Sequence, residues 1–552
     1  MTSLRKTCVA AACALAAASG HAFTFKTDSL SGSFDSSVGM GFGVRLKDPD
    51  PSLIMSGNTG GPAGVAAPVA SGLGDQGTLN YARGDLFTLY LKGSHELLLQ
   101  LPEDFRFMGR VNWVRDFAAT HTTGWLSSAS TAPELQGSGL SDAAASDLRF
   151  KGRVLDLWLS KTFAVGEQQA RLRVGNQVIS WGESIVTPGG INASNPVDVM
   201  RLSQPGTQLK EGILPAPTIS LASGLAKGLN AELYLQTRWK PNYLPPAGSY
   251  WSVVNGLGVG HEAYGVTEGR ARNGGQWGAA LRWKPEGSSL DLGAYLLRYH
   301  DKSPQVHLDP TTFATSLVYP EDRKLLGVSA NFPLGDWAIG TELSYRPRDA
   351  VFLNPNTTAC ASQGGNCWVD EKKLQWHLTG LLQLSPGNAG GLLSALGASN
   401  GLILSELVVI RYPNLQQSYG PDVVAAGGWG WGNERGAVFD PVAAAVNTVA
   451  AGTRTSAGFN LDCSVTYDGN LIPGWQVNPG LFVSYALAGR TPNIQGTWMK
   501  GARTTNLYVN FTQNPATWQF GLNWSTFRGG REVFDQTLAD RDFIGGYATF
   551  NF

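Results

Sequence analysis

Apolar and polar residues alternate one by one along much of this chain. In residues 34–46 the even positions are apolar, apart from Ser36, whereas the odd positions are small or polar. Side chains two residues apart lie on the same face of a β-strand, so this segment has one apolar and one polar face. The same alternation recurs in residues 105–116, 231–240, 276–284 and 506–512. The pattern predicts an all-β protein built from amphipathic strands.

The connections between these segments are alternately short and long. Short ones include residues 102–104, 166–168, 335–336 and 473–474. Long ones cover residues 48–82, 118–148, 182–215, 242–274, 301–322, 349–370 and 413–453. Tight turns at one end and long loops at the other are typical of transmembrane barrels. We therefore expect a transmembrane antiparallel up-and-down β-barrel.

About 18 strands are expected, because an even number returns the chain to the end of the barrel at which it began; about 16 is the alternative. The expected strands are residues 34–47, 84–101, 105–117, 150–163, 170–181, 216–223, 229–240, 276–285, 289–300, 323–332, 337–347, 371–383, 401–412, 454–467, 474–488, 502–513, 516–527 and 542–552.

The composition favours a membrane barrel over a soluble β-sandwich. Charged residues make up 15% of the chain, against about 25% in soluble domains. Aromatic residues make up 10%, and we expect those near strand ends to form two girdles at the membrane interfaces. The alternative is that they are core aromatics of a soluble sandwich. The candidates are Trp158, Trp181, Trp239, Trp283, Trp337, Trp376, Trp475, Trp518 and Tyr547.

The N-terminus has the layout of an export signal. Two basic residues precede an apolar stretch over residues 8–19, and Gly20-His21-Ala22 offers small residues before a cleavage point. This layout predicts a Sec signal peptide over residues 1–22 and a mature barrel over residues 23–552. Export and a barrel together predict the outer membrane of a Gram-negative bacterium, with outer-membrane lipid and lipopolysaccharide around the protein.

Two further features bear on export and assembly. A lipoprotein acylated at Cys13 is an alternative, but it needs a more apolar upstream residue than Ala10. At the other end, Phe552 and Phe550 continue the apolar face of a final alternating strand that includes Ile544. A terminal aromatic on such a strand resembles the signal read by the outer-membrane assembly machinery, which is therefore an expected partner.

Three cysteines follow the predicted cleavage point. Cys360 and Cys367 bracket a short polar loop, and an exported chain meets an oxidising compartment, so we expect a disulfide. Zinc binding is the poorer alternative because no histidine lies beside them. Cys463 lies in a strand pattern and is expected to be a buried or lipid-facing small residue.

Residues 171–220 carry the most distinctive motifs of the chain. They are Gly175, Gln177, Trp181-Gly182-Glu183-Ser184, Asn195-Pro196-Val197-Asp198, Pro205-Gly206, Lys210-Glu211 and Pro215, with further agreement in residues 236–239 and 245–248. On these motifs the mature chain resembles, over its whole length, the proteobacterial outer-membrane family catalogued as domain of unknown function 1302 (DUF1302).

The resemblance implies a long porin-like barrel. It also implies a link to a periplasmic protein and to an inner-membrane lipid transporter of the resistance-nodulation-division type. By that association the cargo would be hydrophobic or amphipathic. Residues 429–435 and 440–451 depart from the family pattern.

Residues 182–215 leave the strand alternation and are expected to fold into the lumen. A barrel of about 16 to 18 strands has an aqueous bore unless something narrows it. Asn195 before Pro196 predicts the N-cap and first residue of a short helix over about 196–203. An ordinary surface loop is the alternative. The expected constriction residues are Trp181, Gly182, Glu183, Ser184, Asn195, Pro196 and Asp198.

Charged and polar residues on the inward face are candidates for lining the pore. They would either set the electric field of the pore or pair with one another in a filled lumen, and the sequence does not choose between these readings. The candidates are Arg106, Arg110, Asp116, Arg171, Arg173, Gln177, Glu232, Arg238, Arg282, Glu342, Arg346 and Glu406.

Motifs for catalysis are poor in the sequence. No H-E-x-x-H pair or P-loop occurs, and no cofactor or metal is expected. The 42 basic and 42 acidic residues balance, which gives no sign of a nucleic-acid partner. We expect an outer-membrane channel or facilitator for small hydrophobic or amphipathic molecules rather than an enzyme. A surface structural or adhesion barrel acting through its long loops is the alternative.

Overall fold

The structure is a computed structural model that describes residues 23–28, 30–50, 53, 75–122, 135, 138–204, 206–207, 209–312, 314–355, 360–427 and 451–552. The predicted signal peptide over residues 1–22 lies outside these residues, as do the stretches 429–435 and 440–450.

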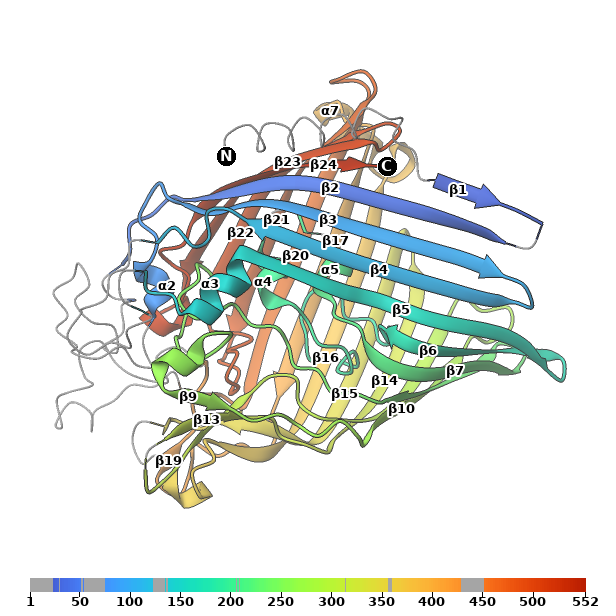
Figure 1. Cartoon of the computed structure of the whole chain (residues 1–552). Helices are drawn as coiled ribbons and strands as arrows, with labels where there is room; N and C mark the ends of the chain where they lie inside the picture. The colour runs from blue at the N-terminus through green and yellow to red at the C-terminus, as the bar shows by residue number, and fades with distance from the viewer. Residues whose placement is uncertain are drawn as a thin grey trace.

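Eighteen strands of the described chain form one closed antiparallel barrel (Figure 1). Each strand pairs with the next one around the ring, and the last strand pairs with the first. The predicted fold class is confirmed, and so is a count of about 18 strands over about 16. The barrel strands are β2 (Ser31–Arg45), β3 (Leu86–Leu101), β4 (Phe105–Asp116), β5 (Phe150–Val165), β6 (Gln168–Gln177), β7 (Ala216–Ala226), β8 (Leu229–Gln236), β10 (Gln276–Trp283), β11 (Asp291–Tyr299), β14 (Arg323–Leu334), β15 (Trp337–Phe352), β16 (Trp368–Leu384), β17 (Asn400–Arg411), β20 (Thr455–Asp468), β21 (Trp475–Ala488), β22 (Ala502–Gln513), β23 (Trp518–Gly529) and β24 (Phe543–Asn551).

The ring closes between β2 and β24. These strands pair from Arg45 opposite Phe543 to Ser37 opposite Asn551. A further short strand, β1 (Phe23–Lys26), pairs with the remaining end of β2. The closing strand thus follows the alternation predicted for the last segment of the sequence.

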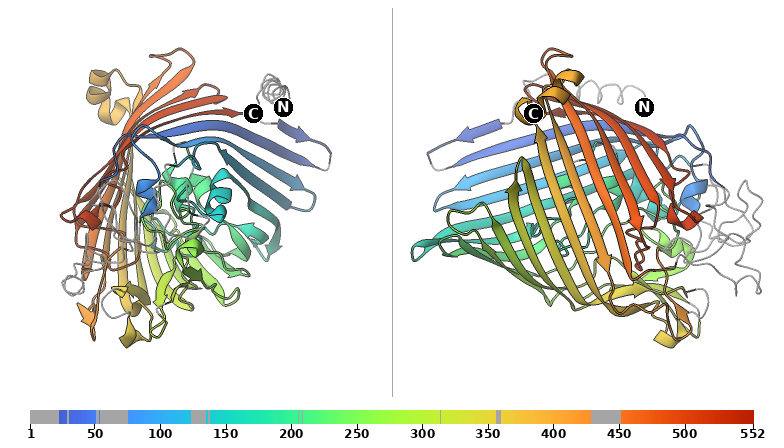
Figure 2. Two further views of the ribbon diagram at one scale, coloured as in Figure 1. Left: turned by 60° about the vertical axis from the view of Figure 1, so that its left-hand side comes forward. Right: turned by 180° about the vertical axis from the view of Figure 1, so that it is seen from behind.

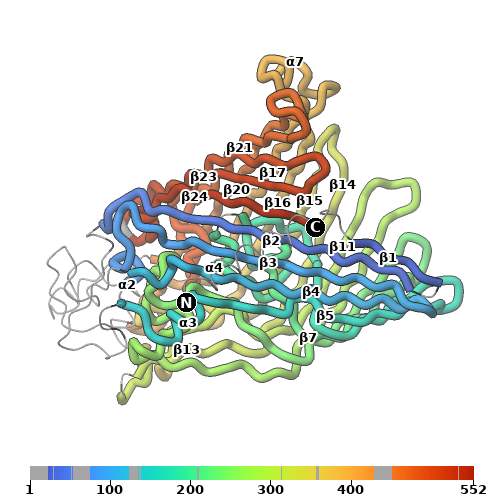
Figure 3. The backbone as a smooth tube through the Cα atoms, turned by 45° about the horizontal axis from the view of Figure 1, so that its top comes forward, coloured from blue at the N-terminus to red at the C-terminus, as the bar shows by residue number. Residues whose placement is uncertain are grey.

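The two ends of the barrel differ in their connections. In Figure 1 the longer loops gather with α2 (Gln76–Leu79) and α3 (Asp142–Arg149) at one end, which we call the loop end. The tight β3–β4 and β5–β6 turns lie at the other end, the turn end. A helix, α7 (Pro386–Leu396), joins β16 to β17 at the turn end and projects from the rim (Figure 3).

The side chains of each strand alternate between the outside and the inside of the ring. On β8, Leu233 and Leu235 are 51% and 49% exposed, whereas Tyr234 and Gln236 between them are buried. The outer surface is therefore apolar and the inner surface is polar or aromatic, as the alternation predicts.

Strand β15 is longer than the sequence suggested. The expected strand ended at residue 347, but β15 continues to Phe352 through a register shift between Arg346 and Asp349. Pro347 falls within this shift, and a bulge accommodates a residue that has no N–H to donate. The expected loop over residues 349–370 is therefore wrong at both ends, because β16 already begins at Trp368.

The long connections contain structure of their own. Strands β9 (Val266–Glu268), β12 (Gln305–Leu308) and β13 (Thr315–Val318) form a separate small sheet. Strands β18 (Ser418–Tyr419) and β19 (Asp422–Val423) form a hairpin. Short 3₁₀ helices lie at η3 (His261–Tyr264), η4 (Ala361–Gln363) and η8 (Val533–Asp535).

The loop end has a hydrophobic core that includes a disulfide. Cys360 and Cys367 are joined, and both are fully buried beside Leu353 and Val424. Cys463 is a free, half-buried cysteine on β20. No helix of the described residues is long and apolar enough to cross a membrane.

Candidate transport path inside the barrel

The segment between β6 and β7 turns back into the ring instead of covering it from outside (Figure 2). Its Trp181 packs against Tyr234 of β8 and Tyr295 of β11, with ring centroids 5.0 and 5.8 Å apart. Trp181 Nε1 also donates to Glu232 Oε2 at 2.9 Å. Tyr234, Tyr295 and Glu232 all lie on the inward face of the barrel, so the segment lies within the lumen. We call residues 178–215 the inserted segment.

Two glutamates of the opposite wall hold the first part of the inserted segment by its main chain. Glu406 of β17 accepts the N–H groups of Ile185, Val186 and Thr187 at 2.9, 3.2 and 2.8 Å. Glu342 of β15 accepts those of residues 183, 184 and 191 at 2.5, 3.3 and 2.9 Å. Six backbone N–H groups of the inserted segment, which have no strand partner, are thus paired with carboxylate oxygens.

Neighbouring side chains complete this attachment. His377 Nδ1 lies 3.0 Å from Glu406 Oε1. Arg346 donates to the carbonyl of Gly190 at 2.9 Å and to the Tyr299 hydroxyl at 2.8 Å. Glu342, Arg346 and Glu406 are each no more than 2% exposed. These three predicted pore-lining residues therefore anchor the inserted segment and do not face open space.

The predicted helix is present but begins later. Helix α4 (Val199–Ser203) is capped by Asp198, which accepts from Arg201 N at 2.7 Å and pairs with Arg153 of β5. The expected start at residue 196, with Asn195 as N-cap, is wrong. The Asn195 amide instead bridges both main-chain groups of Ile179, at 3.0 and 2.5 Å, so it fixes the entry of the segment rather than a helix.

The last part of the inserted segment, with α5 (Leu209–Gly212), contacts β3 and β24, near the place where β2 and β24 close the ring. Lys92 of β3 donates to Glu211 at 2.9 Å and to the Gly206 carbonyl at 2.7 Å. Gly206 has a φ of +67° and lies against the Tyr547 ring of β24, where a Cβ would approach ring carbon at 2.5 Å. Only glycine fits both the conformation and the space.

Two inward arginines of the β3–β6 wall, Arg110 and Arg173, have partners within that wall. Arg110 pairs with Asp156 and lies 3.8 Å from Glu96. The Arg173 guanidinium lies 4.1 Å from the ring centroid of Trp158, in cation–π contact. These predicted pore-lining residues are therefore partnered within the wall.

The remaining candidates fall into two groups. Asp116 and Gln177 are buried and hold strand ends: Asp116 accepts from the main chain of Ala118 and Ala119, and Gln177 donates to the carbonyl of Thr218. The second group is open: Arg171, Glu232 and Arg282 line a hollow of about 360 Å³. Arg106 and Arg238 are exposed.

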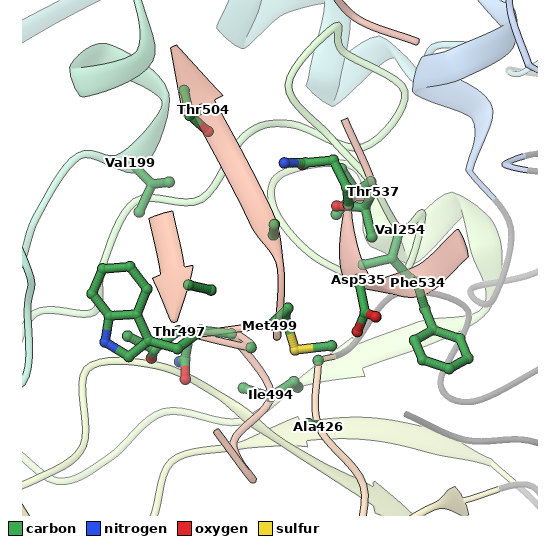
Figure 4. A pocket seen from close by; sticks show the side chains of 18 of the residues that line it. Val199, Val254, Ala426, Ile494, Thr497, Met499, Thr504, Phe534, Asp535 and Thr537 are labelled. Atoms are coloured by element: carbon green, nitrogen blue, oxygen red, sulfur yellow. The ribbon is translucent and has the colours of Figure 1, made fainter. Parts of the chain in front are cut away.

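Open space remains on the side of the lumen that the anchored part of the segment does not fill. At the loop end lies a hollow of about 380 Å³ (Figure 4), which we call the vestibule. Its lining is mostly apolar and comes from several loops. The main apolar side chains are Val254, Leu257, Ile494, Trp498, Met499 and Phe534.

Two charged residues, Arg503 and Asp535, line the vestibule. Arg490 donates to both carboxylate oxygens of Asp535 at 2.6 and 2.8 Å. Burial alone would raise the pKa of Asp535, but hydrogen bonds from Arg490 and from the main chain hold that pKa below its ordinary value. The carboxylate is therefore ionised and neutralised by its partner.

A second hollow of about 530 Å³, the inner chamber, lies between β20–β24 and the inserted segment. It shares Trp251 and Thr504 with the vestibule, so the two hollows adjoin. The wall of the chamber carries amides, hydroxyls and one carboxylate. They are Asp462, Asn506, Tyr508, Asn510, Asn523, Ser525 and Tyr547.

Sequence reasoning passed over the inner chamber because it looked for charges. The pattern in residues 506–512 did place Asn506 and Asn510 on the polar face of a strand. The pattern does not give the position of the inserted segment. That position decides which part of the inner wall stays open.

Comparison with known proteins places the chain in a family and beside several barrels. A family model described as protein of unknown function (DUF1302) matches residues 3–552. The structure is similar to that of OccAB1 from Acinetobacter baumannii, with a TM-score of 0.44, 11% identity, and coverage of 96% of this chain and 98% of that one. It is also similar to Pseudomonas aeruginosa OccK2 (OpdF) in complex with glucuronate, with a TM-score of 0.41, 10% identity, and coverage of 94% and 97%. A BenF-like porin from Pseudomonas fluorescens Pf-5 gives a TM-score of 0.42, 9% identity, and coverage of 94% and 98%.

No curated protein sequence matches the chain. Within the described residues, no group of three or more His, Cys, Asp or Glu side chains is arranged to hold a metal ion.

Proposed function

The chain belongs to the DUF1302 family, and from the interior of its barrel we propose that it is an outer-membrane channel for small amphipathic molecules. The observation that carries this proposal is the pair of adjoining hollows, vestibule and inner chamber, between the inserted segment and strands β20–β24. Together they form a route from the loop end into the lumen.

The outer surface supports placement in a membrane. Large apolar side chains such as Leu326, Val328 and Leu343 are 50%, 55% and 41% exposed on neighbouring strands. Each Å² of apolar surface left in water costs about 25 cal/mol, and a lipid environment removes that cost. A closed ring of strands also leaves no unpaired edge in the hydrocarbon.

The inserted segment supports a narrow route rather than a wide pore. A ring of this size would otherwise enclose a broad water-filled bore. The segment fills the side of the lumen next to β8–β17 through Trp181, Glu342 and Glu406. The adjoining vestibule and inner chamber offer a solute a path along the β20–β24 wall.

The lining favours amphipathic cargo. The vestibule offers apolar contact through residues such as Ile494 and Phe534, and the inner chamber offers amides and hydroxyls such as Asn506 and Tyr508. Specific sites for small molecules combine these two kinds of surface. The Asp535 carboxylate at the edge of the vestibule is paired with Arg490, so it is not free to bind a cationic solute.

The test is to obstruct the inner chamber and record single-channel currents in planar bilayers. Asn523→Trp places an indole in the chamber, and we expect it to lower the unitary conductance several-fold. In liposome-swelling assays the same variant should slow entry of a neutral aromatic glycoside. The matched control is Thr162→Trp, which adds the same ring to the hollow beside Arg171 on the far wall.

Two results would contradict this route. One is equal conductance in Asn523→Trp and wild type, and the other is a greater loss in Thr162→Trp. A wild-type barrel that inserts into bilayers yet carries no current would favour the alternative of a surface adhesion barrel acting through its loops.

A further inference from the structure

Basic side chains gather on the outer surface of the barrel at the loop end of strands β11–β17. The geometry points to a binding surface for the phosphate groups of the phosphorylated glycolipid in the outer leaflet. This inference rests on the proposed outer-membrane placement but not on channel activity. Its basic residues are Arg272, Arg298, Lys324, Arg348, Lys372 and Arg411, which we call the basic rim.

Strand register fixes the height of the rim. Arg298 of β11 lies directly opposite Lys324 of β14, and both point outward near the loop ends of their strands. On its other side Arg298 faces Trp277 of β10, which is 38% exposed. An indole beside a row of cations is the arrangement expected where hydrocarbon gives way to headgroups.

Toward the turn end, the rows next to the rim are apolar across β11–β16 and reach the rim again at Arg411 of β17. One step toward the turn end, Leu296, Leu326, Tyr345 and Leu374 face one another in turn across β11–β16, and Leu374 faces Arg411. One step further down, the row contains Val328, Leu343 and Trp376. The basic rim therefore stands at the upper edge of the surface that would contact acyl chains.

Half of the rim is already paired with carboxylates or carbonyls. Arg298 lies 2.8 Å from Asp322, and Arg272 lies 2.8 Å from Glu321 and also pairs with Asp322. Arg348 donates to the Asp322 carbonyl at 3.1 Å. These contacts hold the arginines in place but neutralise part of their charge.

The other half lacks ionic partners. Among the described residues, no carboxylate forms an ion pair with Lys324, Lys372 or Arg411. All three basic side chains are exposed. The nearby acids are engaged elsewhere: Asp370 pairs with Arg323, and Glu371 accepts from the Tyr419 hydroxyl at 2.5 Å.

A lipid-borne phosphate fits this surface better than a soluble anion. The cations form an arc along the lipid boundary, where a glycolipid presents its phosphates while its acyl chains lie on the apolar rows below. Arginine and lysine bind phosphate through charge-assisted hydrogen bonds. Each basic residue near a charged membrane surface adds to lipid affinity, and loss of three should weaken binding by at least about tenfold.

The experiment compares two lipids on the detergent-purified barrel by native mass spectrometry: bisphosphorylated lipid A and the same lipid without its phosphates. We expect the wild type to prefer the phosphorylated form at least about tenfold. The variant with Lys324→Ala, Lys372→Ala and Arg411→Ala should lose that preference. A charge-conserving variant with Lys324→Arg, Lys372→Arg and Arg411→Lys should retain the preference for the phosphorylated lipid.

A control triple removes equal charge from the turn end, with Lys161→Ala, Lys227→Ala and Lys284→Ala, and should keep the preference. Equal binding of both lipids by the wild type would overturn the inference, as would a preference that survives in the rim alanine variant. Displacement of the lipid by equimolar free pyrophosphate would also overturn it. A barrel that keeps the lipid preference but does not conduct would defeat the channel proposal alone.

Discussion

Glu342 and Glu406 each use both carboxylate oxygens to accept backbone N–H groups of the inserted segment. A buried charge is costly unless hydrogen bonds replace its water, and here the main chain supplies them. The same bonds satisfy donors of a segment that belongs to no helix or strand. Two side chains thus hold a stretch of irregular backbone inside the barrel, where the surrounding protein covers it.

Glu406→Gln tests this attachment by replacing one carboxylate oxygen of Glu406 with an NH2 group. Glutamine keeps one acceptor oxygen and turns an amide toward backbone N–H groups, so bonds worth roughly 1.5–3 kcal/mol each are lost. We expect residues 185–187 to detach from the wall, with larger and noisier single-channel currents. Asp156→Asn is the control, because Asp156 pairs with Arg110 within the wall. Currents that match the wild type would show that Glu406 does not hold the segment in place.

Lys302 gives a pH-dependent prediction outside the barrel strands. It is buried in the loop after β11 and donates to Gln276 Oε1 at 2.8 Å. Burial lowers its pKa from 10.5 to about 7, although Asp301 acts in the opposite direction. Below pH 7 the folded protein buries an ammonium group, and between pH 7 and pH 10.5 it releases the proton while the unfolded chain keeps it. The free energy of unfolding contributed by this group therefore rises with pH across that window.

Lys302→Met should raise the free energy of unfolding on the order of 2 kcal/mol near pH 6 and change it little near pH 11. Guanidinium denaturation of the detergent-solubilised barrel at both pH values measures the difference. Lys284→Met, at an exposed position, should show no such dependence. An equal effect of Lys302→Met at both pH values would mean that the buried ammonium is not its cause.

At the scale of elements, the strands could be predicted and the interior could not. Alternation identifies a strand from its own residues, because the period of two is a local property of extended backbone. It located β8, β10 and β22 and the final strand within a few residues. It missed the continuation of β15 past Pro347, since a bulge breaks the period at that point.

The inserted segment shows why the rest was out of reach. Its departure from alternation at Trp181 was visible, and so was a short helix after Pro196. Its anchors, Glu342 and Glu406, are more than 150 residues away in sequence. Nothing local distinguishes a glutamate that binds main chain from one that faces open water. The chamber beside Asn523 could be recognised only once the position of the segment was known.

At the scale of the whole molecule, the inner chamber lies apart from the ion-paired wall of the barrel. The paired charges of Arg110 and Asp156 lie on β4 and β5, whereas the inner chamber lies along β20–β24. Asp462 is the carboxylate that borders the chamber, and its Oδ1 accepts from the Tyr508 hydroxyl at 2.7 Å. A fixed charge acts on ions within about one Debye length, which is about 10 Å at 0.1 M salt.

Ion selectivity should therefore depend on Asp462 more than on the arginines of the far wall. We expect Asp462→Asn to lower the cation-to-anion permeability ratio about two- to threefold, with a larger change at 0.01 M salt, where the Debye length is about 30 Å. Arg110→Ala combined with Arg173→Ala should shift the reversal potential less, because both arginines are already partnered within the β3–β6 wall. Reversal potentials across a tenfold salt gradient measure both variants. If the arginine pair dominates instead, ions cross along that wall, and the route through the inner chamber is wrong.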